Sequence, residues 1–262
     1  MSKLTALITG ASSGIGYELA KIHAQNHYNL VLVARSSDKL ANVKKELEYQ
    51  YPVSVQILAL DISVAVNIQK LTDFTDSQSI RIDHLINNAG IGVYGKYWET
   101  SVEDHLKLIQ LNVNALVALT HHYSKKMVAH GSGKILNVAS TAAFMPGPFM
   151  STYFASKAFV LSFGEAVDSE LSDTEVSLTT LCPGPTKTGF EAAASGMKES
   201  GLFTKSKVAT AKDVALDGYD AMMKGNPVIV SGLINKLNVF SIRFSPRSWV
   251  IAITKSIMKP VN

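Results

Sequence analysis

The chain has little cysteine: Cys182 is the only one among 262 residues, so no internal disulfide can form. We therefore expect a reducing, cytoplasmic setting. Because Cys182 ends an apolar run, we interpret it as a core residue rather than a nucleophile. Linkers, repeats and low-complexity tracts are also missing, and the first apolar run is broken at Gly10, which argues against a cleaved signal peptide.

Patterns typical of metal sites and nucleic-acid surfaces are missing as well. Two histidine pairs, His23 with His27 and His121 with His122, have no acidic or thiol partner at ligand spacing. They fall in stretches with helical periodicity, so we expect solvated helix faces and no metal site. The net charge of +4 is concentrated in an apolar tail rather than an aromatic-studded patch, which makes nucleic acid a poor candidate partner.

What the sequence does contain is a regular alternation of short apolar runs with helical or polar stretches. The runs are residues 4–8, 30–34, 53–60, 85–87, 134–140, 176–182 and 227–230. This alternation predicts an α/β fold: a doubly wound, Rossmann-type parallel sheet of about seven strands, with helices on both faces and a ligand crevice at the carboxyl ends of the strands. Length and an apolar content of 47% suit a single domain over 1–262, with a core to about 232 and a basic extension over about 233–262.

A glycine turn connects the first apolar run to a helical pattern. It reads Thr9-Gly10-Ala-Ser12-Ser13-Gly14-Ile15-Gly16. Gly10 permits a sharp turn, Gly14 lets the backbone approach a pyrophosphate, and Gly16 allows close helix packing. The start of the helix adds unpaired N–H groups for an anion. The turn therefore indicates a phosphate cradle, with a plain tight turn as the alternative.

Tyr153 and Lys157 are four residues apart, so on a helix they share one face. A phenol has an ordinary pKa of about 10, and a nearby ammonium favours its phenolate form and lowers that pKa toward neutrality, where general acid catalysis works best. For an isolated pair, two neighbours on a solvated face are the better interpretation. The surrounding motifs must decide.

Taken together, these motifs resemble the short-chain dehydrogenase/reductase family, from about residue 3 to about residue 230. The glycine turn, Asp61 after the third strand, 87–90 after the fourth and Pro183-Gly184 after the sixth carry the resemblance. The family's catalytic tetrad falls on Asn112, Ser140, Tyr153 and Lys157. Asn112 is also an unfavourable residue within a helical pattern, although an ordinary exposed Asn is the alternative.

The resemblance implies an enzyme similar to NADP(H)-dependent carbonyl and 3-oxoacyl reductases, which moves a hydride between nicotinamide and a carbonyl or secondary alcohol. Tyr153 would deliver the proton, Ser140 would hold the oxygen, Lys157 would lower the phenol pKa and hold the nicotinamide ribose, and Asn112 would hold a water. The implied cofactor-binding residues are Gly10, Ser12, Ser13, Gly14, Ile15, Gly16, Arg35, Asp61, Ile62, Asn88, Ala89, Gly90, Tyr153, Lys157, Pro183, Gly184 and Thr188. Relatives usually pair through helices corresponding to 101–130 and 152–172, so a homo-oligomer, dimer or tetramer, is expected. A non-catalytic NADP(H)-binding redox regulator is the alternative, against which the intact tetrad argues.

Cofactor choice depends on Arg35, which ends the second apolar run. An acidic residue there binds the ribose 2′-hydroxyl of NAD, whereas an Arg accommodates the 2′-phosphate of NADP. Ser36 and Ser37 add donors, and we interpret Asp38 as an acid in the first turn of the following helix. NADP(H) is therefore expected over NAD(H), although Ser12 and Ser13 stand where many NADP-preferring relatives carry a basic residue.

The substrate side is apolar. Between Ser140 and Tyr153 the chain has Phe144, Met145, Pro146, Pro148, Phe149 and Met150, and we expect Val93, Tyr94 and Phe190 near the same mouth. This favours a bulky or lipophilic carbonyl compound, with residues 189–210 as a lid, although the same apolar surface would also suit a subunit contact.

The carboxyl-terminal segment, residues 226–262, has five basic residues and no acidic one. An apolar stripe beside these charges predicts an amphipathic helix, and its longest uncharged run, 248–254, is much too short to span a bilayer. Peripheral contact with an anionic membrane is one interpretation. Packing on the core or on a partner subunit is the interpretation we favour from sequence.

Overall fold

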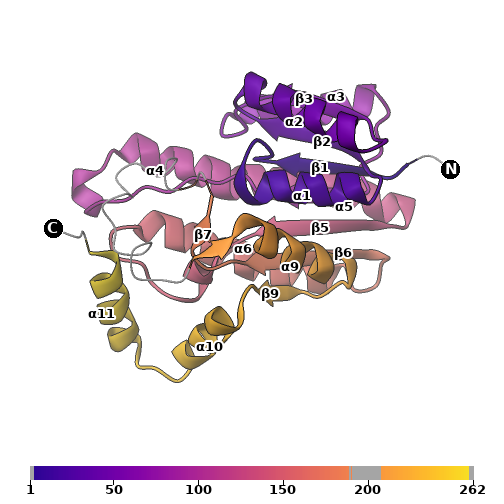
Figure 1. Ribbon diagram of the computed structural model, residues 1–262. Coiled ribbons are helices and arrows are strands. Elements are labelled where there is room, and N and C mark those ends of the chain that lie inside the picture. Colours follow the sequence, from indigo (N-terminus) through magenta and orange to yellow (C-terminus); the bar gives the residue numbers. More distant parts are fainter. Residues whose placement is uncertain (1–2, 189, 191–207, 260–262) are drawn as a thin grey trace.

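Seven short strands form one sheet in the computed structural model, which describes residues 3–188, 190 and 208–259 (Figure 1). The strand order is β3-β2-β1-β4-β5-β6-β9, and every neighbouring pair is parallel. The strands are β1 (Thr5–Thr9), β2 (Asn29–Ala34), β3 (Val55–Ala59), β4 (His84–Asn87), β5 (Gly133–Val138), β6 (Val176–Cys182) and β9 (Val228–Val230). The predicted doubly wound, Rossmann-type fold is confirmed.

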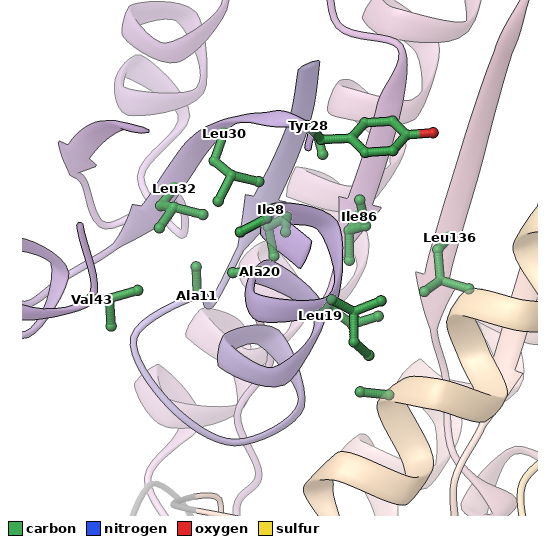
Figure 2. Close-up of a cluster of buried hydrophobic side chains, with 14 of the residues drawn as sticks. Ile8, Ala11, Leu19, Ala20, Tyr28, Leu30, Leu32, Val43, Ile86 and Leu136 are labelled. Atoms are coloured by element: carbon green, nitrogen blue, oxygen red, sulfur yellow. The ribbon is translucent and has the colours of Figure 1, made fainter. Parts of the chain in front are cut away.

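Helices cover both faces of the sheet. On one face lie α1 (Gly14–Gln25), α2 (Ser37–Gln50) and α9 (Ala211–Met223), and on the other α3 (Ala65–Ser77), α5 (Leu116–His130) and α6 (Ser151–Glu170). Side chains alternate along a strand. Ile8 therefore packs in the cluster of Leu19 on α1, where Figure 2 shows it beside Ile86, while its neighbour Leu7 packs with Leu119 on α5. Each such fully buried side chain contributes about 1.5–3 kcal/mol to folding.

The sheet order reverses between β1 and β4, which follow one another in the sheet but not in the chain. Ile8 pairs with both Leu32 of β2 and Ile86 of β4, so the carboxyl ends of β1 and β4 lie side by side. Ligands of open α/β sheets bind outside the strand ends at such a reversal. The register therefore brings the glycine turn next to residues 87–90.

The helix predicted around Asn112 has a widened backbone. It begins as α4 (Val102–Ile109), passes through the π-helical segment η2 (Gln110–Ala115) and continues as α5. Such π segments occur frequently at functional sites. Here η2 contains Asn112, whose side chain is buried.

The remaining elements lie at the carboxyl ends of the strands. They are the short 3₁₀ segments η1 (Tyr97–Glu99) and η3 (Thr141–Phe144), the paired strands β7 (Thr186–Lys187) and β8 (Ala209–Thr210), and the terminal helices α10 (Leu233–Ile242) and α11 (Arg247–Met258). In Figure 1 the two terminal helices (yellow) form the outer edge of this end of the molecule. The expected lid, 189–210, falls almost entirely outside the described residues. Within the described ranges, the longest apolar stretches of helix fall short of what a bilayer crossing needs.

His23 corrects one prediction. It lies four residues after Leu19 on the buried face of α1, with no exposed surface, rather than on a solvated face. The His23 Nδ1 lies 2.7 Å from the Leu19 carbonyl, and because a carbonyl can only accept, this nitrogen is the donor. In the neutral ring the other nitrogen, Nε2, is then an acceptor, and it accepts from Nδ1 of His84 at 3.2 Å. The other three histidines of the two pairs stay at least partly exposed, and His122 lies 3.5 Å from Asp76.

Candidate active site

The glycine turn has the backbone that its sequence predicts. Gly10 and Gly14 have φ values of 67° and 58°, a region that favours glycine. A Cβ on Gly16 would lie 2.4 Å from the Gly10 carbonyl oxygen, so only glycine lets α1 pack this closely. Ser13, at the N-cap, makes no side-chain capping bond to any described residue. The amides at the start of α1 are therefore free of a side-chain cap, as an anion site requires.

Thr9 fastens this turn to the end of β4. Its hydroxyl accepts from the backbone N–H groups of Asn88 and Ala89, both at 3.0 Å, and donates to the Ile86 carbonyl. The Asn88 amide donates in return to the Thr9 and Gly10 carbonyls. Thr9 was missed as a site residue by sequence reasoning, and Asn88, expected to line the crevice, also holds the turn in shape.

Tyr153, Lys157 and Ser140 come together at the carboxyl end of β5. Tyr153 and Lys157 share one face of α6, with the Lys157 Nζ 5.7 Å from the centroid of the Tyr153 ring. Ser140 follows β5 and caps η3, with its hydroxyl close to the Tyr153 phenol. Lys157 is only 5% exposed and donates to the Val138 carbonyl at 2.8 Å. The predicted spacing thus produces the expected cluster.

The electrostatics of this cluster correct the expected direction for the phenol. Burial raises the pKa of Tyr153 to about 12, and the hydrogen bond with Ser140 only partly opposes it. Burial also lowers the pKa of Lys157 to about 8, which disfavours its charged form. Desolvation therefore outweighs the attraction expected between phenolate and ammonium. At neutral pH the phenol keeps its proton, which is the form a proton donor needs.

Asn112 lies behind this cluster rather than in the cavity. Its Nδ2 donates to the Ile91 carbonyl at 3.0 Å and to Oγ of Ser156 at 3.1 Å, and its Oδ1 accepts from the Ile91 N–H at 3.0 Å. A Cβ on Gly90 would lie 3.3 Å from the Asn112 Oδ1 and 3.5 Å from the Lys157 Nζ. The Asn112 amide thus joins η2, α6 and the loop after β4 close to the Lys157 ammonium.

A cavity of about 1640 Å³ runs along the ends of the strands. It is lined by all of the predicted site residues except Gly16 and Asn112, which lie behind its wall. The predicted residues that line it are Gly10, Ser12, Ser13, Gly14, Ile15, Arg35, Asp61, Ile62, Asn88, Ala89, Gly90, Ser140, Tyr153, Lys157, Pro183, Gly184 and Thr188. Thr188 lies against Gly14: a Cβ added to Gly14 would be 2.9 Å from the Cβ of Thr188.

One end of the cavity is cationic. Arg35 and Lys39 both line it, and Lys39, four residues after Arg35, was missed by sequence reasoning. Ser36 caps α2 by accepting from the Lys39 N–H. Burial alone would raise the pKa of Asp61, but hydrogen bonds from Ser63 and nearby cations together lower it, so this carboxylate stays ionised beside them.

Comparison with known proteins agrees with this geometry. The family model described as short chain dehydrogenase matches residues 4–199. The chain belongs to this family. It is an oxidoreductase of the dehydrogenase/reductase class, acting on hydroxyl or carbonyl groups.

Two curated members of the short-chain dehydrogenase family and one solved structure illustrate the likeness. An NADP-dependent 3-hydroxy acid dehydrogenase of Schizosaccharomyces pombe is 32% identical over 88% of this chain and 92% of that protein. Ketoacyl reductase HetN of a Nostoc species is 30% identical over 93% of this chain and 86% of that protein. A short-chain dehydrogenase from Sphingobium yanoikuyae in complex with NADPH has a TM-score of 0.80 at 29% identity, covering 91% of this chain and 92% of that one.

The other end of this short-chain dehydrogenase's cavity is apolar. Met145, Met150 and Phe190 line it, as predicted, whereas Phe144 packs elsewhere, with Leu116, Ala139 and Val160. Val93 and Tyr94, expected near the same mouth, are buried and do not line it.

The terminal helices supply a wall that sequence reasoning missed. Ile257 and Met258 of α11 and Val239 of α10 line the cavity. The Tyr94 hydroxyl anchors this wall by donating to the Met258 carbonyl at 2.6 Å.

Proposed function

We propose that the protein uses NADPH to reduce a bulky or lipophilic carbonyl compound. The observation that carries this proposal is one cavity with a cationic end, an apolar end and the Ser140–Tyr153–Lys157 cluster along its wall. Such an arrangement suits a phosphorylated dinucleotide at one end and an apolar substrate at the other.

The donor set supports a dinucleotide. The uncapped start of α1 and the glycine turn provide the N–H groups and the space that a pyrophosphate needs. Arg35 offers a planar fork to a 2′-phosphate and Lys39 a second positive charge. The relatives named for NADP or bound to NADPH support the same choice.

The chemistry follows from the side chains. When bound, a reduced nicotinamide supplies the hydride that the carbonyl carbon accepts. Tyr153 gives its phenolic proton to the carbonyl oxygen, and the hydroxyl of Ser140, whose bond to the Pro183 carbonyl is long at 3.3 Å, donates to the same oxygen. Lys157 stabilises the phenolate that remains until a proton returns from solvent.

A panel of carbonyl compounds tests this function directly. NADPH oxidation is followed with ketones, 3-oxoacyl thioesters, steroids, sugars and quinones. We expect turnover with lipophilic members. Tyr153→Phe should lower turnover at least about a hundredfold and leave NADPH binding, measured by its fluorescence, unchanged. Tight NADPH binding without turnover on any compound would instead support a redox regulator, and near-wild-type turnover in Tyr153→Phe would exclude the role given to the phenol.

We also propose a cytoplasmic homo-oligomer. The single cysteine, buried and free, supports a reducing compartment. Pairing through α4 and α6 is supported by exposed apolar side chains on both helices, among them Val102, Leu106 and Phe159.

A further inference from the structure

The terminal helices α10 and α11 and the segment between them carry a set of exposed large apolar side chains, most of which lie outside the cavity lining. Leu233 is 72% exposed, Phe244 75% and Trp249 65%. Leu237, Phe240 and Ile253 are exposed to a similar degree. A contiguous exposed apolar patch on a protein surface marks a place where something else binds. We call this set the terminal apolar face.

One side of α10 carries a row of apolar side chains that faces outward. Leu233, Leu237 and Phe240 are spaced by four and three residues, so they share one side of the helix. The row continues to Phe244, whose ring lies 5.2 Å from that of Phe240. Val239, the one buried residue described for α10, lies on the opposite side. The apolar row therefore does not pack on the sheet.

In α11 a similar row leads from the surface to the cavity. Val250, Thr254 and Met258 form the buried side. The adjacent row, four residues per step, is Trp249, Ile253 and Ile257, of which the first two are exposed and the last lines the cavity. Part of α11 thus packs on the core, as favoured from sequence, while its neighbouring row connects the outer surface to the apolar end of the site.

Charge decides what covers this face. Five exposed cations, Lys236, Arg243, Arg247, Lys255 and Lys259, lie on the two terminal helices or next to their ends, and residues 226–262 contain no carboxylate side chain. A second copy bound through the same face about a twofold axis would bring these cations together, which is unfavourable. An anionic surface attracts them. A helix with aromatic and aliphatic residues on one side and Lys or Arg beside them is typical of a segment that lies in a membrane interface.

We propose that the terminal apolar face docks on an anionic bilayer surface and presents the apolar end of the cavity to the lipid. With ten and twelve residues, α10 and α11 are too short to cross a bilayer but long enough to lie in its interface. The substrate class narrows accordingly to carbonyl compounds that partition into membranes. This second part rests on the proposed function, whereas the docking itself does not.

Vesicle binding tests the docking without any turnover. Full-length protein is floated with vesicles of phosphatidylcholine containing about 30% phosphatidylglycerol and with vesicles of phosphatidylcholine alone. We expect flotation with the anionic vesicles and loss of it at high salt. Because Trp98 and Trp249 are the only tryptophans, Trp98→Phe leaves Trp249 as the sole reporter, and its emission should shift to shorter wavelength on binding.

Matched variants separate the apolar and the charged contributions. The double variant Phe244→Ser/Trp249→Ser, at exposed positions outside the cavity lining, should abolish flotation and keep activity on a water-soluble ketone. Lys236→Gln/Lys255→Gln should weaken partitioning by about fivefold for each cation removed. Tyr49→Ser, at a 91% exposed position on α2, is the control and should float like the wild type.

The outcomes distinguish docking from function. If the wild-type protein does not bind anionic vesicles, the proposal is overturned. If, in addition, Phe244→Ser/Trp249→Ser lowers the mass measured by sedimentation, the face is a contact between copies. Flotation without turnover on any carbonyl leaves docking standing and refutes the proposed function. Anionic vesicles should raise activity on a lipid-partitioned ketone only when the terminal apolar face is intact, and equal activity of Phe244→Ser/Trp249→Ser on that ketone would overturn the substrate class.

Discussion

The buried pair of His23 and His84 should make the fold sensitive to mild acid. Burial lowers the pKa of His23 to about 4 and that of His84 to about 3. For His84, the positive charge of a protonated His23 lowers the pKa further. In the unfolded chain both titrate near about 6.5. Between that value and the folded pKa the unfolded state binds more protons, so stability is fully present above about pH 6.5 and is lost as the pH falls.

The magnitude follows from the two shifts. Below about pH 6.5 each histidine lowers the free energy of unfolding by about 1.36 kcal/mol per pH unit, which amounts to about 2 kcal/mol for each by about pH 5. The pair therefore removes about 4 kcal/mol, a large fraction of the 5–15 kcal/mol that typically holds a domain together. Protonation of His23 at Nε2 would also replace the acceptor that His84 uses at 3.2 Å.

Urea unfolding at several pH values between about 7.5 and 5 measures this effect. We expect the free energy of unfolding of the wild type to fall steeply. The double variant His23→Gln/His84→Gln should start lower, because polar amides replace packed rings, but its pH slope should be much flatter. The exposed His27→Gln is the matched control and should keep the wild-type slope. Equal slopes in the wild type and the double variant would refute the reasoning.

Three further predictions concern the site. Because burial lowers the pKa of Lys157 to about 8, its charge is present below that pH and lost above it, so kcat/KM for reduction should fall about tenfold per unit above about pH 8, and a flat profile would contradict this. Gly90→Ala places a methyl group 3.3 Å from the Asn112 Oδ1 and should cost about 1–3 kcal/mol in urea unfolding together with a fall in kcat/KM, whereas unchanged kinetics would show that the loop yields freely. Arg35→Asp should raise the ratio of NADH to NADPH kcat/KM at least about tenfold, and an unchanged ratio would remove Arg35 from cofactor selection.

Local sequence patterns predicted the fold and the polar half of the site. All seven apolar runs became strands, because each run is short, largely apolar and bounded by turns or helices. The glycine turn and the spacing of Tyr153 and Lys157 were equally visible, since both are set within a single stretch of chain. These features require no knowledge of what packs against them.

Features set by distant parts of the chain were not predictable in this way. His23 is buried beside His84, 61 residues away, and burial lowers its pKa to about 4, so that it is neutral. The pKa of Tyr153 rises because of its burial within the folded site. The role of Met258 as cavity wall depends on a hydrogen bond to Tyr94, 164 residues earlier. Periodicity reports which side of a helix is apolar, but not whether that side meets the sheet, a ligand or another surface.

The cavity wall built by α10 and α11 lies beyond residue 199, where the match to the family model ends. The later stretch of the chain thus adds α10 and α11 to an apolar end that Met145, Met150 and Phe190 of the earlier stretch also line. Exchanging about thirty residues at the carboxyl end between homologues should change substrate selectivity and leave the catalytic residues in place, provided that Tyr94, which hydrogen-bonds to the last helix, is kept. Substrate selectivity can therefore diverge among homologues through changes in this short region.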